Sequence, residues 1–218
     1  MLLYAITNRR LLPGDDSARR QHLVRLAADL ARGGVHYLQI REKDLPLADL
    51  QPLAAQVVQA VRAIGGPTRV LVNGPAQVAL DADADGVHLR SGLGPTAVRA
   101  AQQVYSRVGR EAIISVACHD HDEIRQAAGA SLLLFSPIFE KVRDDGVTPG
   151  QGLAALRSAA DFASPVPVFA LGGVTEKNAS AAIRSGAAGI AAIRLFVGPA
   201  WRPLAVESTT PTSPSSTS

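Results

Sequence analysis

Short apolar runs alternate along this chain with longer segments in which apolar residues recur every three or four positions. The short runs predict eight strands, at residues 2–6, 35–40, 69–72, 86–89, 112–116, 131–135, 166–170 and 189–193. The longer segments have the spacing of helices that pack on a sheet, at residues 18–32, 47–64, 76–81, 95–108, 121–128, 152–162 and 176–185. A short eighth helix is expected at residues 199–206.

This regular alternation predicts an α/β protein with a single domain. Glycines such as Gly34, Gly86, Gly129 and Gly189 precede alternate strands, where a helix must stop and the chain must reverse. Eight strand–helix units in one chain favour a (β/α)₈ TIM barrel, and an open doubly wound sheet is the alternative. The barrel domain is assigned to residues 1–207. Residues 208–218 are polar and interrupted by proline, so they are expected to form a disordered tail.

The composition excludes several classes of protein. The chain has 218 residues, a formal net charge of +3 and 47% hydrophobic residues, so intrinsic disorder is excluded for most of it. Scattered arginines and an aromatic content of 4% argue against a nucleic-acid partner. No run is long enough to span a membrane, and residues 1–10 have neither the basic nor the apolar region of a secretion signal, so none is expected. The single cysteine, Cys118, fits a reducing compartment, so a cytoplasmic location is expected.

Polar residues close the predicted strands at the end where TIM barrels carry their sites. Gln39 and Arg41 fall on the same face of the second strand and Lys43 follows them, and a polar interior pair would be costly in a purely structural core. The alternative is a charged loop solvated at the rim. The next two strands end in Asn73 and His88, and a lone strand histidine is as often a core group as a functional one.

The fifth strand leads to Cys118, His119, Asp120 and His121. These residues do not indicate a zinc site. A closed zinc site needs four ligands, and the sequence has no second cluster of Cys or His to supply the rest. Asp120 or His121 is expected to cap the following helix. His119 shares a strand face with Ser115 and Ala117, and Cys118 falls on the other face.

Two glycines, Gly172 and Gly173, follow the seventh strand, and Ile193 and Arg194 end the eighth. Backbone amides exposed in these two loops form the usual phosphate site of such barrels. The sequence therefore predicts a phosphate-binding site at these four residues.

Seven stretches of the chain resemble the thiamine phosphate synthase and TenI family of small barrels, in the family's order. They are Tyr4-Ala5-Ile6-Thr7-Asn8, Leu38-Gln39-Ile40-Arg41-Glu42-Lys43, Val72-Asn73, Asp85-Gly86-Val87-His88-Leu89, Ser115-Val116-Ala117-Cys118-His119, Leu134-Phe135-Ser136-Pro137-Ile138-Phe139, and Ala170-Leu171-Gly172-Gly173-Val174 with residues 186–193. The resemblance implies a thiazole phosphate as substrate. It implies that Gln39, Arg41, Lys43, Asn73 and His88 contact it.

The resemblance leaves two enzymes to compare. Synthases of the family couple a pyrimidine diphosphate to a thiazole phosphate and hold Mg²⁺ with two carboxylates, at positions that correspond here to Gly74 and Leu93. Their threonine–lysine run after the sixth strand is replaced by a segment that contains Lys141, Arg143, Asp144 and Asp145. Asp144 and Asp145 are the only route to a relocated metal ion, and the roles of Arg90, Lys141 and Arg143 are left open.

The TenI branch contains thiazole tautomerases, which aromatise a thiazole carboxylate phosphate without a metal. The branch resembles this chain at Asn73-Gly74, Ser91-Gly92 and Phe139-Glu140, and its catalytic histidine falls on His119. Our sequence-based interpretation is therefore a thiazole tautomerase, an isomerase with no cofactor. The Mg²⁺-dependent synthase is the alternative, and a barrel that binds phosphate ligands without turnover is a third. A homo-oligomer is compatible with each of these.

Overall fold

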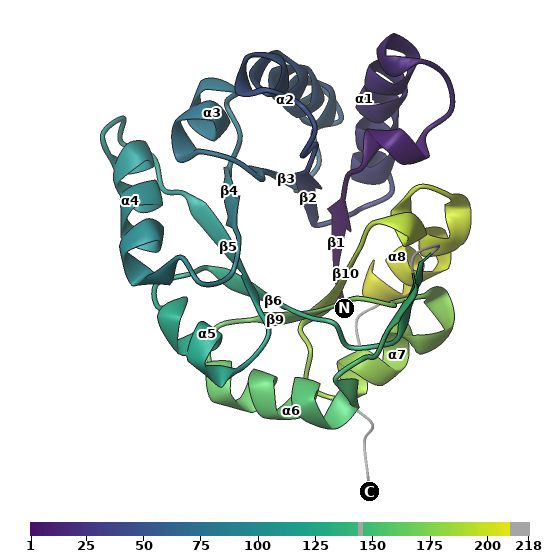
Figure 1. Ribbon diagram of the computed structural model, residues 1–218. Helices are drawn as coiled ribbons and strands as arrows, with labels where there is room; N and C mark the ends of the chain where they lie inside the picture. Colours follow the sequence, from purple (N-terminus) through teal and green to yellow (C-terminus); the bar gives the residue numbers. More distant parts are fainter. Residues whose placement is uncertain (144–145, 210–218) are drawn as a thin grey trace, which may run out of the picture.

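The computed structural model describes residues 1–143 and 146–209. Eight parallel strands close into a barrel at the centre of Figure 1, in the order β1-β10-β9-β6-β5-β4-β3-β2. These strands are β1 (Leu2–Ile6), β2 (Tyr37–Ile40), β3 (Arg69–Val72), β4 (Gly86–Leu89), β5 (Ile113–Cys118), β6 (Leu132–Phe135), β9 (Val168–Leu171) and β10 (Gly189–Ala192). The (β/α)₈ barrel predicted from the sequence is confirmed, and the open-sheet alternative is wrong.

Helices surround the barrel on its outside (Figure 1). They are α1 (Asp16–Arg32), α2 (Leu47–Arg62), α3 (Ala76–Asp81), α4 (Gly94–Ser106), α5 (His121–Gln126), α6 (Gly152–Ala163), α7 (Glu176–Arg184) and α8 (Arg202–Thr209). Helix α8 runs two residues past the predicted end of the domain, so Ser208 and Thr209 belong to it and not to a tail. Residues 210–218 lie outside the described part of the chain. No described helix is long and apolar enough to cross a membrane.

Most element boundaries agree with the sequence pattern to within two residues. Strand β2 begins later than expected because the Val35 amide donates to the Leu30 carbonyl and so completes the end of α1. Strand β5 continues to Cys118, which is paired in register with Phe135 of β6. Both differences arise from hydrogen bonds that an apolar pattern does not record.

Several short elements were not predicted. The 3₁₀ turns are η1 (Arg9–Leu11), η2 (Arg194–Phe196) and η3 (Pro199–Trp201). An antiparallel hairpin, β7 (Lys141–Arg143) with β8 (Gly146–Thr148), lies between β6 and α6. The hairpin contains Lys141 and Arg143, whose roles the sequence left open.

Two separate apolar clusters divide the core. The larger one lies between the strands and the helices and includes Leu38, Val57 and Val87. The smaller one fills the inside of the barrel and consists of Tyr4, Ile6, Leu71, Leu132, Leu134, Phe169 and Ala191. Alternation along the strands sends successive side chains to these two sides. Polar side chains that share the inner face with the smaller cluster therefore belong to the barrel interior.

Candidate active site at the mouth of the barrel

Four polar side chains form a buried chain inside the barrel. The Tyr4 hydroxyl donates to Oε1 of Gln39 at 3.2 Å and lies 3.2 Å from Oγ of Ser115. The same Ser115 oxygen is 2.9 Å from Nδ1 of His88. Gln39 and His88 are thus brought together as candidate site residues, through Tyr4 and Ser115.

Burial keeps this chain neutral. Burial, together with the positive charges of Arg41 and Lys43, lowers the pKa of His88 from 6.5 to about 4. Burial also raises the pKa of Tyr4 above its usual value. At neutral pH, His88 is therefore an uncharged imidazole with one donor and one acceptor nitrogen, which suits the recognition of a heterocycle.

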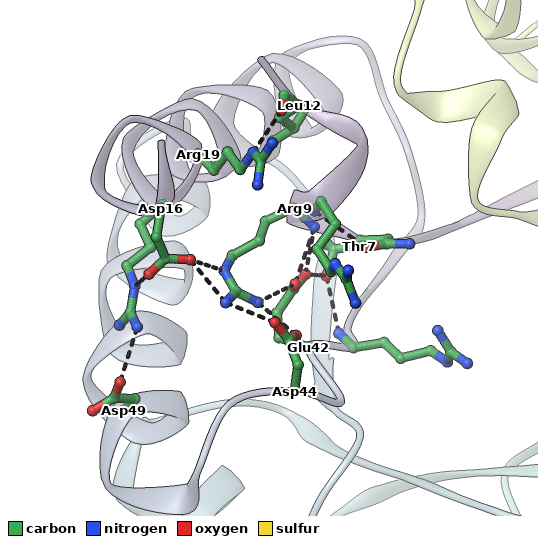
Figure 2. A network of polar contacts seen from close by, with 12 residues as sticks. Thr7, Arg9, Leu12, Asp16, Arg19, Glu42, Asp44 and Asp49 are labelled. Carbon is green, nitrogen blue, oxygen red and sulfur yellow. Dashed lines mark hydrogen bonds and ion pairs between the residues drawn. The ribbon is translucent and has the colours of Figure 1, made fainter. Parts of the chain in front are cut away.

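The loop after β2 carries Arg41 and Lys43, and a charged network lies beside it. Figure 2 shows the Arg9 guanidinium between Asp16 on one side and Glu42 and Asp44 on the other. Arg9 is only 4% exposed, and its hydrogen bond to Asp44 raises its pKa. The Arg9 guanidinium in turn lowers the pKa of Asp44. The alternative interpretation, a charged loop solvated at the rim, therefore holds only in part, because Lys43 is exposed but Glu42 is buried.

His119 follows β5 and is half exposed. Its Nδ1 lies 2.8 Å from Oε2 of Glu123, and the same carboxylate oxygen accepts the His119 backbone N–H at 2.7 Å. Asp120, one of the two expected caps, is the N-cap of α5 and accepts the Glu123 N–H at 2.8 Å. A histidine oriented by a carboxylate on one nitrogen has the other nitrogen available for proton transfer, which is the arrangement a general base needs.

The predicted phosphate loops lie at the ends of β9 and β10. Gly172 and Gly173 have φ values of +97° and +65°, which only glycine adopts without strain. A Cβ on Gly173 would lie 2.4 Å from the Glu140 carbonyl oxygen, so the loop after β6 packs closely against it. Ile193 and Arg194 follow β10 on the neighbouring strand. The N-terminus of α7, capped by Thr175 and Asn178, lies a few residues beyond the glycines and favours an anion.

The described residues do not fit a bound metal ion. Gly74 and Leu93 stand where the resemblance places carboxylates, and no group of three His, Cys, Asp or Glu residues in residues 1–143 and 146–209 could hold a metal. Asp85 accepts the Val70 amide at 2.8 Å near the start of β3, so it lies at the opposite end of the barrel. Asp144 and Asp145 lie outside the described residues.

The other candidates follow strands at the same end of the barrel. Asn73 directly follows β3 and is partly buried, and its backbone N–H donates to the Ile40 carbonyl at 2.9 Å. Arg90 directly follows β4 and is exposed. Lys141 and Arg143 lie in β7, and their side chains are not described.

The sequence pattern does not predict the hydrogen-bond partners of the candidate site residues. Arg9, Thr7 and Glu42 form their contacts across 33 to 35 residues of chain, and no local pattern predicts such a contact. Glu123 offered one usable signal, because an Asp followed three positions later by Glu is typical of a helix start. Ser115 was placed on the correct face, but its bridge from Tyr4 to His88 was not foreseen.

Comparison with known proteins identifies the family of this chain. The family model described as thiamine monophosphate synthase matches residues 3–196, which span the whole barrel. The chain belongs to this family. A thiamine-phosphate synthase from Roseiflexus sp. (strain RS-1) is 32% identical over 90% of this chain and 78% of its own length. A putative thiamine-phosphate synthase from Geobacter sulfurreducens is 34% identical over 89% of this chain and 86% of its own.

A solved structure has the same architecture. Thiamine phosphate pyrophosphorylase from Pyrococcus furiosus superposes with a TM-score of 0.74 and 27% identity, covering 94% of this chain and 92% of its own. The predicted family is therefore confirmed. These relatives do not distinguish the TenI branch within it.

Proposed function

We propose that this chain is an enzyme of thiamine biosynthesis that couples a pyrimidine diphosphate to a thiazole phosphate. The observation that carries the proposal is the family match over residues 3–196, together with relatives that are called thiamine-phosphate synthases. These comparisons favour the transferase over the tautomerase that the sequence alone suggested. Both reactions use a thiazole phosphate, so the predicted phosphate loops serve either one.

The residues at the barrel mouth divide into three roles under this proposal. Gly172, Gly173, Ile193 and Arg194 hold the thiazole phosphate through backbone amides and positive charge. Arg41 and Lys43 bind the diphosphate of the other substrate. Gln39, Asn73 and the neutral His88 recognise heterocyclic atoms with uncharged hydrogen-bonding groups.

The described residues disagree with one property that the resemblance implies. Magnesium would neutralise the charge that develops on a departing diphosphate, but Gly74 and Leu93 offer no carboxylate to hold it. We therefore assign the binding of the diphosphate charge to Arg41 and Lys43.

A second candidate reaction is favoured by His119. This side chain lies against Glu123 at 2.8 Å and belongs to the mouth of the barrel. Tautomerisation needs one base that removes a proton from carbon and returns it at another atom, and an oriented histidine suits that task near neutral pH. The thiazole tautomerase thus remains the alternative to the coupling reaction.

Product analysis separates the candidates. The purified protein is incubated with the pyrimidine diphosphate and thiazole phosphate, and separately with the thiazole carboxylate phosphate, each with magnesium and with EDTA. We expect thiamine phosphate from the first pair. Aromatised thiazole as the only product would replace the proposal with the tautomerase, and binding of thiazole phosphate without any product would indicate the non-catalytic barrel.

A variant pair tests the second candidate. If tautomerisation is observed, His119→Ala is expected to lower its rate by about 10²–10⁴, the usual contribution of a general base. His22→Ala is the control, because His22 is partly exposed on α1, an element that does not carry His119, and its Nδ1 lies 3.1 Å from the Pro13 carbonyl oxygen. An unchanged rate in His119→Ala would exclude His119 as the base.

A further inference from the structure

The charged network in Figure 2 joins the loop after β1 to the loop after β2. Arg9 Nη1 lies 3.2 Å from Oε2 of Glu42 and 2.7 Å from Oδ1 of Asp44, and Nη2 lies 3.0 Å from Oδ2 of Asp44. Arg9 Nε donates to Asp16 at the start of α1 at 2.8 Å. One guanidinium thus ties together three segments of the chain.

Glu42 is the buried centre of this network. Its side chain is 1% exposed, and it accepts the Thr7 hydroxyl at 2.6 Å and the Arg9 backbone N–H at 3.0 and 3.2 Å. A buried carboxylate persists only when it is paired and hydrogen-bonded in this way. Glu42 therefore fixes the loop after β2 against the loop after β1.

The network reaches the backbone of a candidate site residue. The Arg41 N–H donates to Oγ1 of Thr7 at 2.9 Å, and the Thr7 hydroxyl then donates to Glu42. The Thr7 N–H donates in turn to the Gln39 carbonyl at 2.9 Å. Arg41 is consequently held between the end of β2 and the buried carboxylate, and Lys43 follows directly in the same loop.

Charge gives the network a second effect on this loop. Glu42 and Asp44 alternate with Arg41 and Lys43 in the sequence, so the two carboxylates compete with an anionic substrate for these cations unless they are neutralised. Arg9 supplies the neutralising charge from another segment. The positive charges of Arg41 and Lys43 also act at the barrel interior, since they contribute to the lowered pKa of His88.

We propose that Arg9 and Glu42 are positioning residues that hold Arg41 and Lys43 in place to bind the diphosphate group. This inference rests on the proposed coupling function. Its kinetic test needs that activity, whereas its structural test does not. The phosphate loop at Gly172 and Gly173 lies at the ends of other strands, so the network should affect one substrate and not the other.

The kinetic test uses Arg9→Lys, which keeps the positive charge, and Glu42→Gln, which keeps the size of the side chain. We expect KM for the pyrimidine diphosphate to rise about tenfold in each, with KM for the thiazole phosphate unchanged. Arg20→Lys is the matched control, because Arg20 also joins two carboxylates, Asp16 and Asp49, but does not touch Glu42. Combining Arg9→Lys with Arg41→Lys should add little to Arg41→Lys alone, because both changes act through one side chain.

The structural test needs no turnover. Hydrogen exchange at the Arg41 amide should become at least tenfold faster in Arg9→Lys and Glu42→Gln than in Arg20→Lys. Affinity for inorganic pyrophosphate, measured by calorimetry, should be lower in the same two variants than in Arg20→Lys. If the wild type forms no thiamine phosphate, these two measurements still test the positioning role, so failure of the proposed function is distinguished from failure of this inference.

The proposal is overturned if the two KM values rise together, or if Arg41 exchange and pyrophosphate affinity match those of Arg20→Lys. If Arg9→Lys and Glu42→Gln do not fold, Asp44→Asn takes their place, because Asp44 is 42% exposed and accepts from the same guanidinium. The same selective loss of the diphosphate, and the same faster exchange, are then required.

Discussion

One polar network joins β1 to β2 inside the barrel, and a second joins the loops that follow these two strands. The buried groups are neutral in the first network and charged in the second. The interior network runs from Tyr4 to Gln39 and through Ser115 to His88 and is neutral. The loop network centres on Arg9 and Glu42 and is charged. Only Ala5 and Ile6 separate Tyr4 from Thr7 in the sequence, so the two networks lie close along the chain and differ in the partners that their buried groups have.

The partners explain the two outcomes. At His88 the neighbouring charges are positive, so burial and repulsion both favour the neutral imidazole. At Arg9 three carboxylates face one guanidinium, so ionised groups are stabilised despite burial. A neutral interior suits the recognition of heterocycles, and a charged network suits a rigid anchor for the two residues that we propose bind the diphosphate.

Breaking the charged network should have the largest effect on stability. Arg9→Met removes the guanidinium and leaves Glu42 as a buried carboxylate with no countercharge, which typically costs about 3–5 kcal/mol of unfolding free energy. Urea denaturation measures this loss. Adding Glu42→Gln to Arg9→Met should restore part of it, because the unpaired charge is then gone. A loss below about 1 kcal/mol would show that the network is not buried as described.

The neutral network should make the unfolding free energy depend on pH through His88. The pKa of His88 is about 4 in the folded protein against 6.5 when unfolded, so between these values the unfolded chain binds a proton that the folded chain does not. Stability from this group is full above pH 6.5 and falls as the pH drops toward 4, by at most about 3 kcal/mol.

A variant isolates the His88 contribution. His88→Gln cannot titrate, so the difference in unfolding free energy between wild type and variant should change steadily from pH 7 to pH 4. His36 also has a pKa lowered by burial, and His36→Gln reports its share separately. A constant difference for His88→Gln across this range would contradict the neutral, buried assignment.

Removing the bridge in the neutral network should cost less than breaking the charged one. Ser115→Ala leaves the Tyr4 hydroxyl and the His88 Nδ1 with one partner fewer, and an unsatisfied buried polar group costs about 1–3 kcal/mol. Ser158→Ala, which removes an exposed hydroxyl 3.1 Å from His121, is the matched control. Equal midpoints for the two variants in thermal unfolding would mean that Ser115 does not bridge the network.

The two networks also differ in how far the sequence predicts them. Alternation along β2 places Gln39 inside the barrel, and a polar residue at an interior position is by itself a signal of a site. Glu42 looks like one more charge in a solvated loop, because its burial depends on Arg9 and Thr7 from another loop. Periodicity reports which face a residue occupies. It does not report which distant side chain completes that face.

The same limit applies around His119 and the sixth strand. The position of His119 after β5 follows from the strand pattern. Its contact with Glu123 depends on how the chain turns into α5, which the strand pattern does not predict. The β7–β8 hairpin has only three residues in each strand, which is too short a pattern for periodicity to predict it.

The smallest effect is expected where charge is paired but exposed. Arg20 bonds Asp16 and Asp49 at 2.7 and 2.9 Å, distances as short as those of Arg9, but its side chain is 29% exposed against 5% for Arg9. Water already screens such a pair, so Arg20→Met should cost less than about 1 kcal/mol, and 1 M salt should remove most of that cost. The loss in Arg9→Met should persist in 1 M salt, because its carboxylate partner is buried. Equal losses in the two variants at both salt concentrations would mean that ion-pair distance, and not burial, decides what these networks contribute.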